Sequence, residues 1–349
     1  MPYRFKINEP VEKGFRRIAR EQLDAALAEL AGAEVGPGNV HQCRKALKRL
    51  RALVRLAARA LGAGKARRRT KSLGKIASLL SARRDQTVML ETIGKLSDGS
   101  LGAAEALMPL KRSLAAHAAD ERQLLDSDLA GRARMLLLRE AKTFTHIAFK
   151  KRGFGALAGG LEASYRRGRK AAKYAYEEPT DENFHELRKA VQWHWRQMSL
   201  LARAWPDEFA VRVNAARELS QLLGDDHDLA VLIAATAQAG ISAEEKEAAA
   251  TVCQRQQQIL RASAELGVKR LFAEKPKAFV GRMEAYWRCG RSLDPRLEVP
   301  PLVRQVPAVD QVVSKEAEVP ASVKEKRPSP AKPRLAAKLE TPAASQRRA

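Results

Sequence analysis

The chain has 349 residues, of which 45% are hydrophobic, enough for one large or two medium cores, so we expect two domains. A formal net charge of +24 and an isoelectric point near 10.3 imply a polyanionic partner, such as nucleic acid, an acidic membrane surface or a phosphate polymer. Three scattered cysteines argue against a disulfide framework or a structural zinc site. The sequence has neither the apolar h-region of a secretory signal nor an apolar run of roughly 18 residues. We therefore expect a soluble, cytoplasmic protein without membrane insertion.

The periodicity of the chain predicts helices almost throughout. Ala, Leu and Arg dominate, and period-two runs of β-branched residues are absent. We expect helices of roughly 15 to 30 residues that pack as bundles. Gly and Pro place the breaks between them at 36–38, 62–64, 97–99, 159–160, 178–180, 205–206 and 240.

The first informative segment runs from Val35 to Arg84, which contains fifteen Lys or Arg residues and no Asp or Glu. A helix exposed only to water usually interleaves both signs of charge, because like charges at i,i+4 repel. Within this segment one cationic stripe recurs every three or four residues, with Lys45 and Arg49 beside it and an apolar face opposite. The members of the stripe are His41, Arg44, Lys48, Arg51 and Arg55.

A second basic stretch, residues 165–174, again lacks a carboxylate and includes Arg166 and Arg169. It either extends an anion-binding groove or forms a solvated helix end.

The six-residue pattern that begins at His41 recurs at His185, where Arg188 and Lys189 match Arg44 and Lys45. Residues 79–90 also resemble 222–232, so we predict an internal duplication. The second copy departs from the first at Gln192, Trp193 and Trp195, which replace cations, although Arg196 and Arg203 extend its polar face; we therefore expect it to bind an anion less tightly. The two Trp residues either pack between the halves or stack on nucleic-acid bases.

The acidic stretch 225–228 suggests a metal-dependent phosphohydrolase, since a His-Asp pair with further carboxylates can hold a divalent ion. The matching place in the first half reads Arg83-Arg84-Asp85, which cannot build the same site. We therefore predict no metal, no cofactor and no catalysis, and expect Asp85 and Asp228 to cap helix starts and to orient neighbouring arginines.

From Pro300 onward lie eight of the sixteen prolines, among Ala, Ser, Lys and Glu residues. We predict a disordered basic tail over residues 293–349.

At the two His-x-x-Arg-Lys helices, the Leu-Gly-Asp-Asp-His-Asp stretch at 223–228 and the segment 271–276, the chain resembles the CHAD family of α-helical proteins. The resemblance implies an all-α fold of two four-helix bundles related by a pseudo-twofold axis, here residues 1–150 and 151–292. It also implies that the two histidine-bearing helices line a basic cavity for inorganic polyphosphate, and that the protein associates with polyphosphate granules.

A helix stripe of Arg and Lys suits such a ligand, because a linear polyanion needs donors that repeat every turn, about 5.4 Å. A phosphate beside His41 or His185 would favour the protonated imidazole ring and so raise its pKa. Alternatively, either histidine donates a hydrogen bond to a loop carbonyl. Nucleic acid, bound without sequence preference, is the alternative partner, and the sequence does not predict an oligomeric state. The predicted polyphosphate-binding residues are His41, Arg44, Lys45, Lys48, Arg49, Arg51, Arg55, Arg166, Arg169, His185, Arg188, Lys189 and Arg196.

Overall fold

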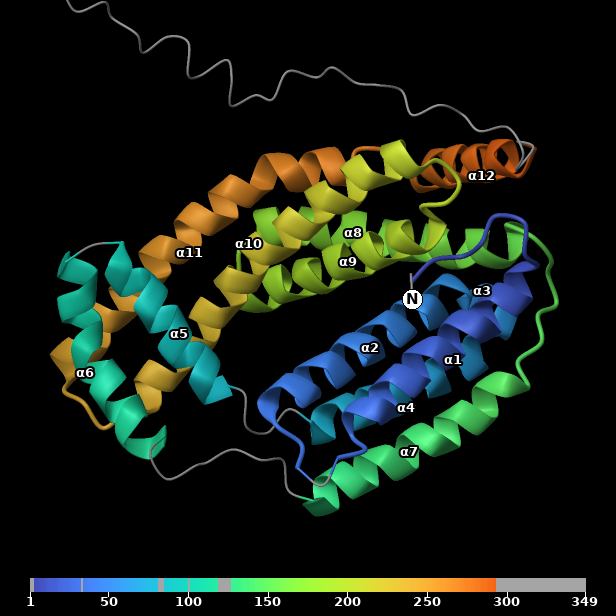
Figure 1. Cartoon of the computed structure of the whole chain (residues 1–349). Coiled ribbons are helices and arrows are strands. Elements are labelled where there is room, and N and C mark those ends of the chain that lie inside the picture. The colour runs from blue at the N-terminus through green and yellow to red at the C-terminus, as the bar shows by residue number, and fades with distance from the viewer. Residues whose placement is uncertain (1–2, 33, 81–84, 100, 119–126, 293–349) are drawn as a thin grey trace, which may run out of the picture. The chain divides into compact units, whose positions relative to one another are not determined.

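The computed structural model describes residues 3–32, 34–80, 85–99, 101–118 and 127–292, and these form helices without any β-strand (Figure 1). The prediction of an all-α fold is confirmed, whereas the predicted tail lies outside the described residues. The helices are α1 Val11–Glu29, α2 Pro37–Leu56, α3 Ala58–Leu61, α4 Ala63–Leu79, α5 Asp85–Asp98, α6 Leu101–Ala118, α7 Ser127–Thr145, α8 Gly155–Glu177, α9 Asp181–Leu201, α10 Pro206–Gln238, α11 Ala243–Leu271 and α12 Pro276–Ser292.

Local chemistry accounts for most helix boundaries. Pro37 and Pro206 open α2 and α10, where a missing backbone N–H costs nothing. The side chain of Thr180 caps α9 by accepting from the backbone N–H of Asn183, and Ser242 forms a capping box with Glu245 at the start of α11. The Thr180 cap and Pro206 mark where α9 and α10 begin, and both helices contribute to the site described below.

The predicted break at Gly159-Gly160 is wrong, because both glycines lie inside α8. A Cβ atom on Gly160 would overlap the backbone carbonyls of Arg55 and Leu56, and one on Gly159 would overlap the side chain of Arg59. The glycines therefore allow α8 to approach the end of α2 closely, and do not end a helix.

Helices α1, α2, α4 and α7 pack against one another and form one group of four (Figure 1). Phe15, Leu47, Leu50 and Phe144 are almost fully buried within this group. The apolar face of α2 therefore points into a core, as its periodicity predicts, and its charged face is left for the surface.

The second group consists of α8 to α12, in which α9 packs on α8 and α10, α10 on α11, and α12 on α8. It meets the first group where α2 and α3 contact α8 and where α2 contacts α9. One continuous apolar core runs through both groups. Phe5 joins them directly, because its backbone N–H donates to the Leu200 carbonyl (2.9 Å) and its ring lies edge-on to Trp287.

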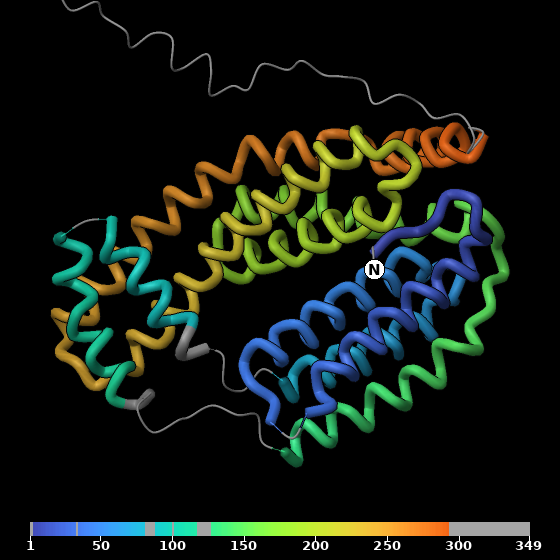
Figure 2. Tube along the Cα trace, in the orientation of Figure 1, coloured from blue at the N-terminus to red at the C-terminus, as the bar shows by residue number. Residues whose placement is uncertain are grey.

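The hairpin of α5 and α6 belongs by sequence to the N-terminal half but packs on α10 and α11 (Figures 1 and 2). A second, smaller core holds it there, built from Ile93, Leu107, Leu110, Leu229, Leu232, Ala249 and Cys253. The hairpin thereby places the first turns of α5 opposite the middle of α10. No described helix has both the length and the apolarity that crossing a membrane requires.

Candidate functional site

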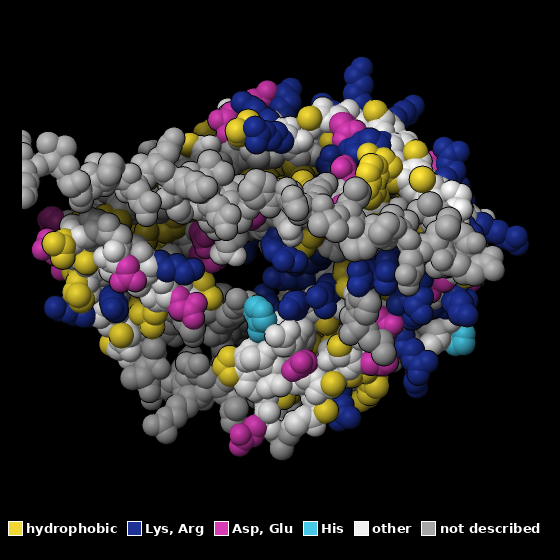
Figure 3. All heavy atoms as spheres, turned by 45° about the horizontal axis from the view of Figure 1, so that its top comes forward, with side chains coloured by type: hydrophobic (Ala, Val, Ile, Leu, Met, Phe, Trp, Pro, Cys, Tyr) yellow, Lys and Arg dark blue, Asp and Glu magenta, His cyan; other side chains and the backbone are white. Residues whose placement is uncertain are grey.

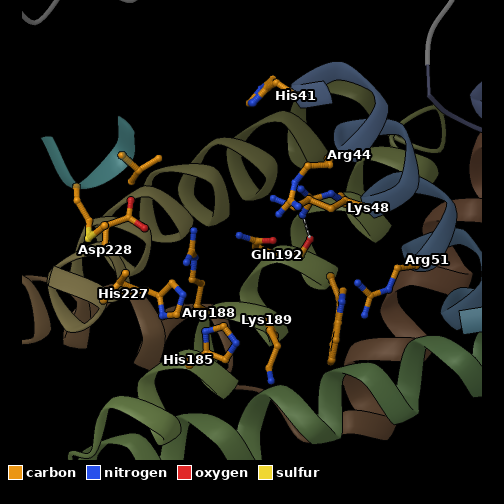
Figure 4. Close-up of a pocket in the computed structure, with 15 residues that line it drawn as sticks. His41, Arg44, Lys48, Arg51, His185, Arg188, Lys189, Gln192, His227 and Asp228 are labelled. Carbon is orange, nitrogen blue, oxygen red and sulfur yellow. Dashed lines mark hydrogen bonds between the residues drawn. The ribbon is translucent and has the colours of Figure 1, made fainter. Parts of the chain in front are cut away.

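A cavity of about 420 Å³ lies between α2 and α9, with α10 and α5 completing its wall (Figure 4). We call it the α2–α9 pocket. Among the described residues that line it, six are Lys or Arg, three are His, and one, Asp228, carries a carboxylate. Its lining consists of His41, Arg44, Lys48, Arg51, Val88, Met89, His185, Arg188, Lys189, Gln192, Trp193, Arg196, His227, Asp228 and Val231.

The contribution of α2 follows from its periodicity. His41, Arg44, Lys48 and Arg51 share one face and point into the pocket, while Leu47 and Leu50 on the other face are fully buried. Because the apolar side chains fix the rotation of the helix, the cations cannot turn away from α9. In the space-filling view, Lys and Arg side chains gather around a central hollow on the face of the molecule that is turned toward the viewer (Figure 3).

Helix α9 supplies the facing wall, and its His185, Arg188 and Lys189 are the predicted counterparts of the α2 residues. The structure therefore brings the two His-x-x-Arg-Lys segments to one site. Lys189 forms an ion pair with Glu186, which also pairs with Arg167 (2.6 Å). The α9 wall thus carries one internal counter-charge just outside the pocket.

Several arginines at the site are held by neutral groups. In the part of the chain that the structure describes, no ion pair joins Lys45, Arg49, Arg51 or Arg55 to a carboxylate. The guanidinium of Arg49 donates to the amide oxygen of Gln22 (3.3 Å), and that of Arg55 lies 3.6 Å from the ring centre of Trp193. Aromatic faces and amide oxygens orient these cations without neutralising their charge.

Burial without a counter-ion is reflected in the pKa values of these arginines. Desolvation lowers the pKa of Arg51, and together with the neighbouring Arg167 and Arg51 it lowers the pKa of Arg55 to about 10. Burial likewise lowers the pKa of Arg196 to about 10. All three remain protonated near neutral pH, so the protein holds partly desolvated positive charge that an anion would stabilise.

Lys45 and Arg49, predicted beside the stripe, line a different hollow of about 380 Å³. Arg196 lines both cavities, and no carboxylate lines this second one among the described residues. Arg4, Tyr3 and Arg217 also contribute to it. Sequence reasoning missed these three, because nothing in their local pattern marks them; only the path of the N-terminal segment and the packing of α10 on α9 bring them there.

Two histidines of the α2–α9 pocket, His185 and His227, lie against each other with ring centres 4.4 Å apart and ring planes tilted by 32° (Figure 4). Burial and the cations Lys189 and Arg188 lower the pKa of His185. Burial, followed by Arg188 and His185, lowers the pKa of His227 to about 4. Both rings are therefore neutral near pH 7 when the pocket holds no anion.

The acidic stretch 225–228 does not converge on a single point. Asp226 is buried and accepts from Nε of Arg261 (2.6 Å), whereas Asp225 pairs with Lys95 (3.8 Å) and only Asp228 lines the pocket. No group of three or more His, Cys, Asp or Glu side chains within the described ranges is placed to hold a metal ion. The predicted role of Asp228 at a helix start is wrong, because it lies in the interior of α10. Asp85 does begin α5, but its side chain lies outside the description.

Arg166 and Arg169 lie away from both cavities. Arg166 pairs with Glu162 on the same helix, and Arg169 donates to the backbone carbonyl of Glu274. Arg169 therefore ties α8 to the segment before α12, and the prediction that both residues extend the groove is wrong. Trp193 is buried under Arg55, consistent with the packing interpretation rather than a base-stacking platform.

The CHAD domain family model matches residues 17–237, which include α2, α9 and most of α10. Among solved structures, PptA from Streptomyces chartreusis is similar, with 15% sequence identity and a TM-score of 0.47, over 76% of this chain and 100% of that one. No curated protein matches the sequence.

Proposed function

The chain belongs to the CHAD domain family, and from this premise we propose that it binds inorganic polyphosphate in the α2–α9 pocket without cleaving it. The observation that carries the proposal is the lining itself, which among the described residues has six Lys or Arg side chains against one carboxylate. A polyphosphate chain carries about one negative charge per phosphate, so one ligand can meet several of these cations in sequence.

The energetics favour many weak contacts over one strong contact. A single exposed pair of charges at 4 Å is worth about 1 kcal/mol in water. Partial burial of Arg51 and Arg196, which both line the pocket, strengthens their contacts with an anion, because the water that screens an exposed pair is partly excluded. Arg side chains can also engage two phosphate oxygens at once, while Lys48 acts as a point charge.

A competition titration tests the ligand class. Long-chain polyphosphate is added to a complex of the protein with fluorescently labelled duplex DNA, at moderate salt and at equal phosphate concentration. We expect polyphosphate to displace the DNA. Failure to displace it would refute the proposal and favour nucleic acid, the alternative that the net charge supports.

The absence of turnover has its own test. The protein is incubated with polyphosphate and Mg²⁺ or Mn²⁺, and orthophosphate is assayed. We expect no release above the blank. Release that disappears in His227→Ala would assign an enzymatic role to the pocket.

We further propose that binding directs the protein to polyphosphate granules. A fluorescent fusion expressed in granule-forming cells should co-localise with the granules. A fusion carrying Arg44→Glu, Lys48→Glu and Arg51→Glu should remain diffuse. Equal recruitment of both fusions would contradict targeting through this pocket.

A further inference from the structure

We infer that the adjacent pair His185 and His227 takes up a proton when a phosphate occupies the α2–α9 pocket, so that polyphosphate binding tightens as the pH falls. The inference rests on the proposed function and adds a mode of regulation to the same site.

The geometry of the pair carries the argument. The centres of the two rings lie 4.4 Å apart, with the ring planes tilted by 32°, on the wall formed by α9 and α10, and both rings line the pocket. Nδ1 of His185 is buried and has no hydrogen-bond partner among the described residues. A buried ring nitrogen without a partner is an unsatisfied polar group. Because Nδ1 is shielded, a phosphate in the pocket acts on this ring through its charge.

Burial, and after it the cations among the surrounding charges, keep the pair neutral in the free protein. On α9 they are Asp181, Glu182, Glu186, Arg188 and Lys189; on α10 they are Asp226 and Asp228; and across the pocket α2 presents His41 and Arg44. Among the side chains of α5 that the structure describes, Val88 and Met89 line the pocket.

Most of these carboxylates already have cationic partners. Arg261 of α11 binds both Asp181 and Asp226, and Glu186 is shared by Arg167 and Lys189. The net field at the rings is therefore cationic, and it opposes protonation.

A bound phosphate reverses the sign of this field. It neutralises Arg188 and Lys189 and brings negative charge to the imidazoles, so their pKa values rise. Two protonated rings in contact repel each other, and we therefore expect the pair to take up about one proton rather than two.

The sign of the pH dependence follows from linkage. Above the pKa of the occupied pocket, both rings are neutral with and without ligand, and affinity does not change with pH. Between that value and the lower pKa of the free protein, which is about 4 for His227, each proton taken up raises affinity by up to about tenfold per pH unit. Below the free pKa the affinity levels off.

Isothermal titration calorimetry tests the inference on the full chain. Long-chain polyphosphate is titrated into the protein at about pH 6.5, in two buffers that differ in ionisation enthalpy, which gives the number of protons taken up. We expect about one proton for the native protein and close to none for the double variant His185→Gln, His227→Gln. The exposed His146 lies outside the pocket, and His146→Gln should keep the native value.

The outcomes separate the two proposals. Binding without proton uptake, or uptake that persists in the double variant, overturns the histidine pair and leaves polyphosphate binding intact. Absence of binding overturns the proposed function, and the inference with it. Should the double variant fail to fold, NMR titration of the six histidines of the native protein decides the matter. The pKa values of His185 and His227 should rise on adding polyphosphate, and unchanged values would refute the inference.

Discussion

The guanidinium of Arg55 lies 3.6 Å from the ring centre of Trp193, and Arg167 lies 5.0 Å from the same ring. Arg55 comes from α2, whereas Trp193 and Arg167 come from α9 and α8. An aromatic face, in place of a carboxylate, thus joins the two groups of helices at the edge of the pocket. The contact holds a cation in place and leaves its charge available to a ligand.

A carboxylate placed inside the pocket should compete with the ligand. Gln192 lines the pocket, and Gln192→Glu changes its charge with little change in shape. We expect polyphosphate affinity to fall about fivefold to tenfold, since one added like charge at contact distance costs about 1 kcal/mol. The same change at the exposed Gln258 on α11, outside the described cavities, is the matched control. Equal effects of both substitutions on the dissociation constant would show that only net charge matters.

Reversing Arg44, Lys48 and Arg51 to Glu should lower polyphosphate affinity by at least about 100-fold, because three contacts of about 1 kcal/mol are lost and repulsion replaces them. The matched variant reverses Lys324, Lys326 and Lys332 near the C-terminus, with the same change in net charge. We expect a much smaller loss there, because Arg44, Lys48 and Arg51 are the cations that α2 holds in the lining of the pocket. Binding is measured by fluorescence anisotropy, and similar losses in both variants would locate the site elsewhere.

The salt dependence of binding should reflect the number of cations in the pocket. Six Lys or Arg side chains line it among the residues that the structure describes. The logarithm of the association constant should therefore fall with the logarithm of salt concentration with a slope of about −4. Titrations at several NaCl concentrations give the slope directly. A value near −1 would mean that few of these side chains touch phosphate.

His194 should make the folded state sensitive to acid. It is 3% exposed among Tyr165, Phe272 and Phe279, and burial, with Arg212 nearby, lowers its pKa to about 3. Above the unfolded-state pKa of about 6.5 the ring is neutral in both states and contributes nothing to the pH dependence. Below it the unfolded chain binds a proton that the folded chain cannot bind, so stability is lost as the pH falls toward 3.

The variant His194→Phe should remove that part of the acid sensitivity. Between about pH 7.5 and 5, the native protein should lose about 2 kcal/mol more unfolding free energy than the variant. Urea unfolding at the two pH values measures the difference. Parallel losses in both proteins would mean that the ring is protonated in the folded state.

Gly160→Ala should destabilise the fold by about 1–3 kcal/mol or more, because the added methyl group overlaps backbone carbonyls at the end of α2. Gly281 of α12 is the matched control, since nothing lies within 4 Å of a Cβ atom placed there. Gly281→Ala should raise stability by up to about 1 kcal/mol through helix propensity. Thermal unfolding measures both, and a stabilised Gly160→Ala would disprove the close approach of α8 to α2.

The sequence predicted those parts of the site that depend on a single helix. The rotation of α2 follows from Leu47 and Leu50, so its cationic face could be read directly from the spacing. The repeat at His185 identified the facing helix. Spacing could not show that Arg166 and Arg169 turn toward Glu162 and the Glu274 carbonyl. The periodicity of one helix shows which residues share a face, but it does not show which segment packs against that face.

Two further features depended on contacts between distant segments. Gly159-Gly160 has the composition of a break, and only the approach of α2 explains why a helix continues through it. The stretch 225–228 has the composition of a metal site. Within one continuous helix, however, successive residues point about 100° apart, so Asp225, Asp226 and Asp228 face Lys95, Arg261 and the pocket respectively.

The contact between Phe5 and Trp287 has a consequence for biosynthesis. Phe5 precedes all of the described helices and Trp287 lies in the last of them, so Trp287 leaves the ribosome only after almost all of the described helices have been made. Until then the apolar side chains that pack against Trp287, Phe5 among them, lack this contact. The nascent chain therefore keeps apolar surface exposed to solvent while α9 and α10 are being translated. Chaperone protection during that interval should matter more for this chain than for a protein whose first and last helices belong to separate domains.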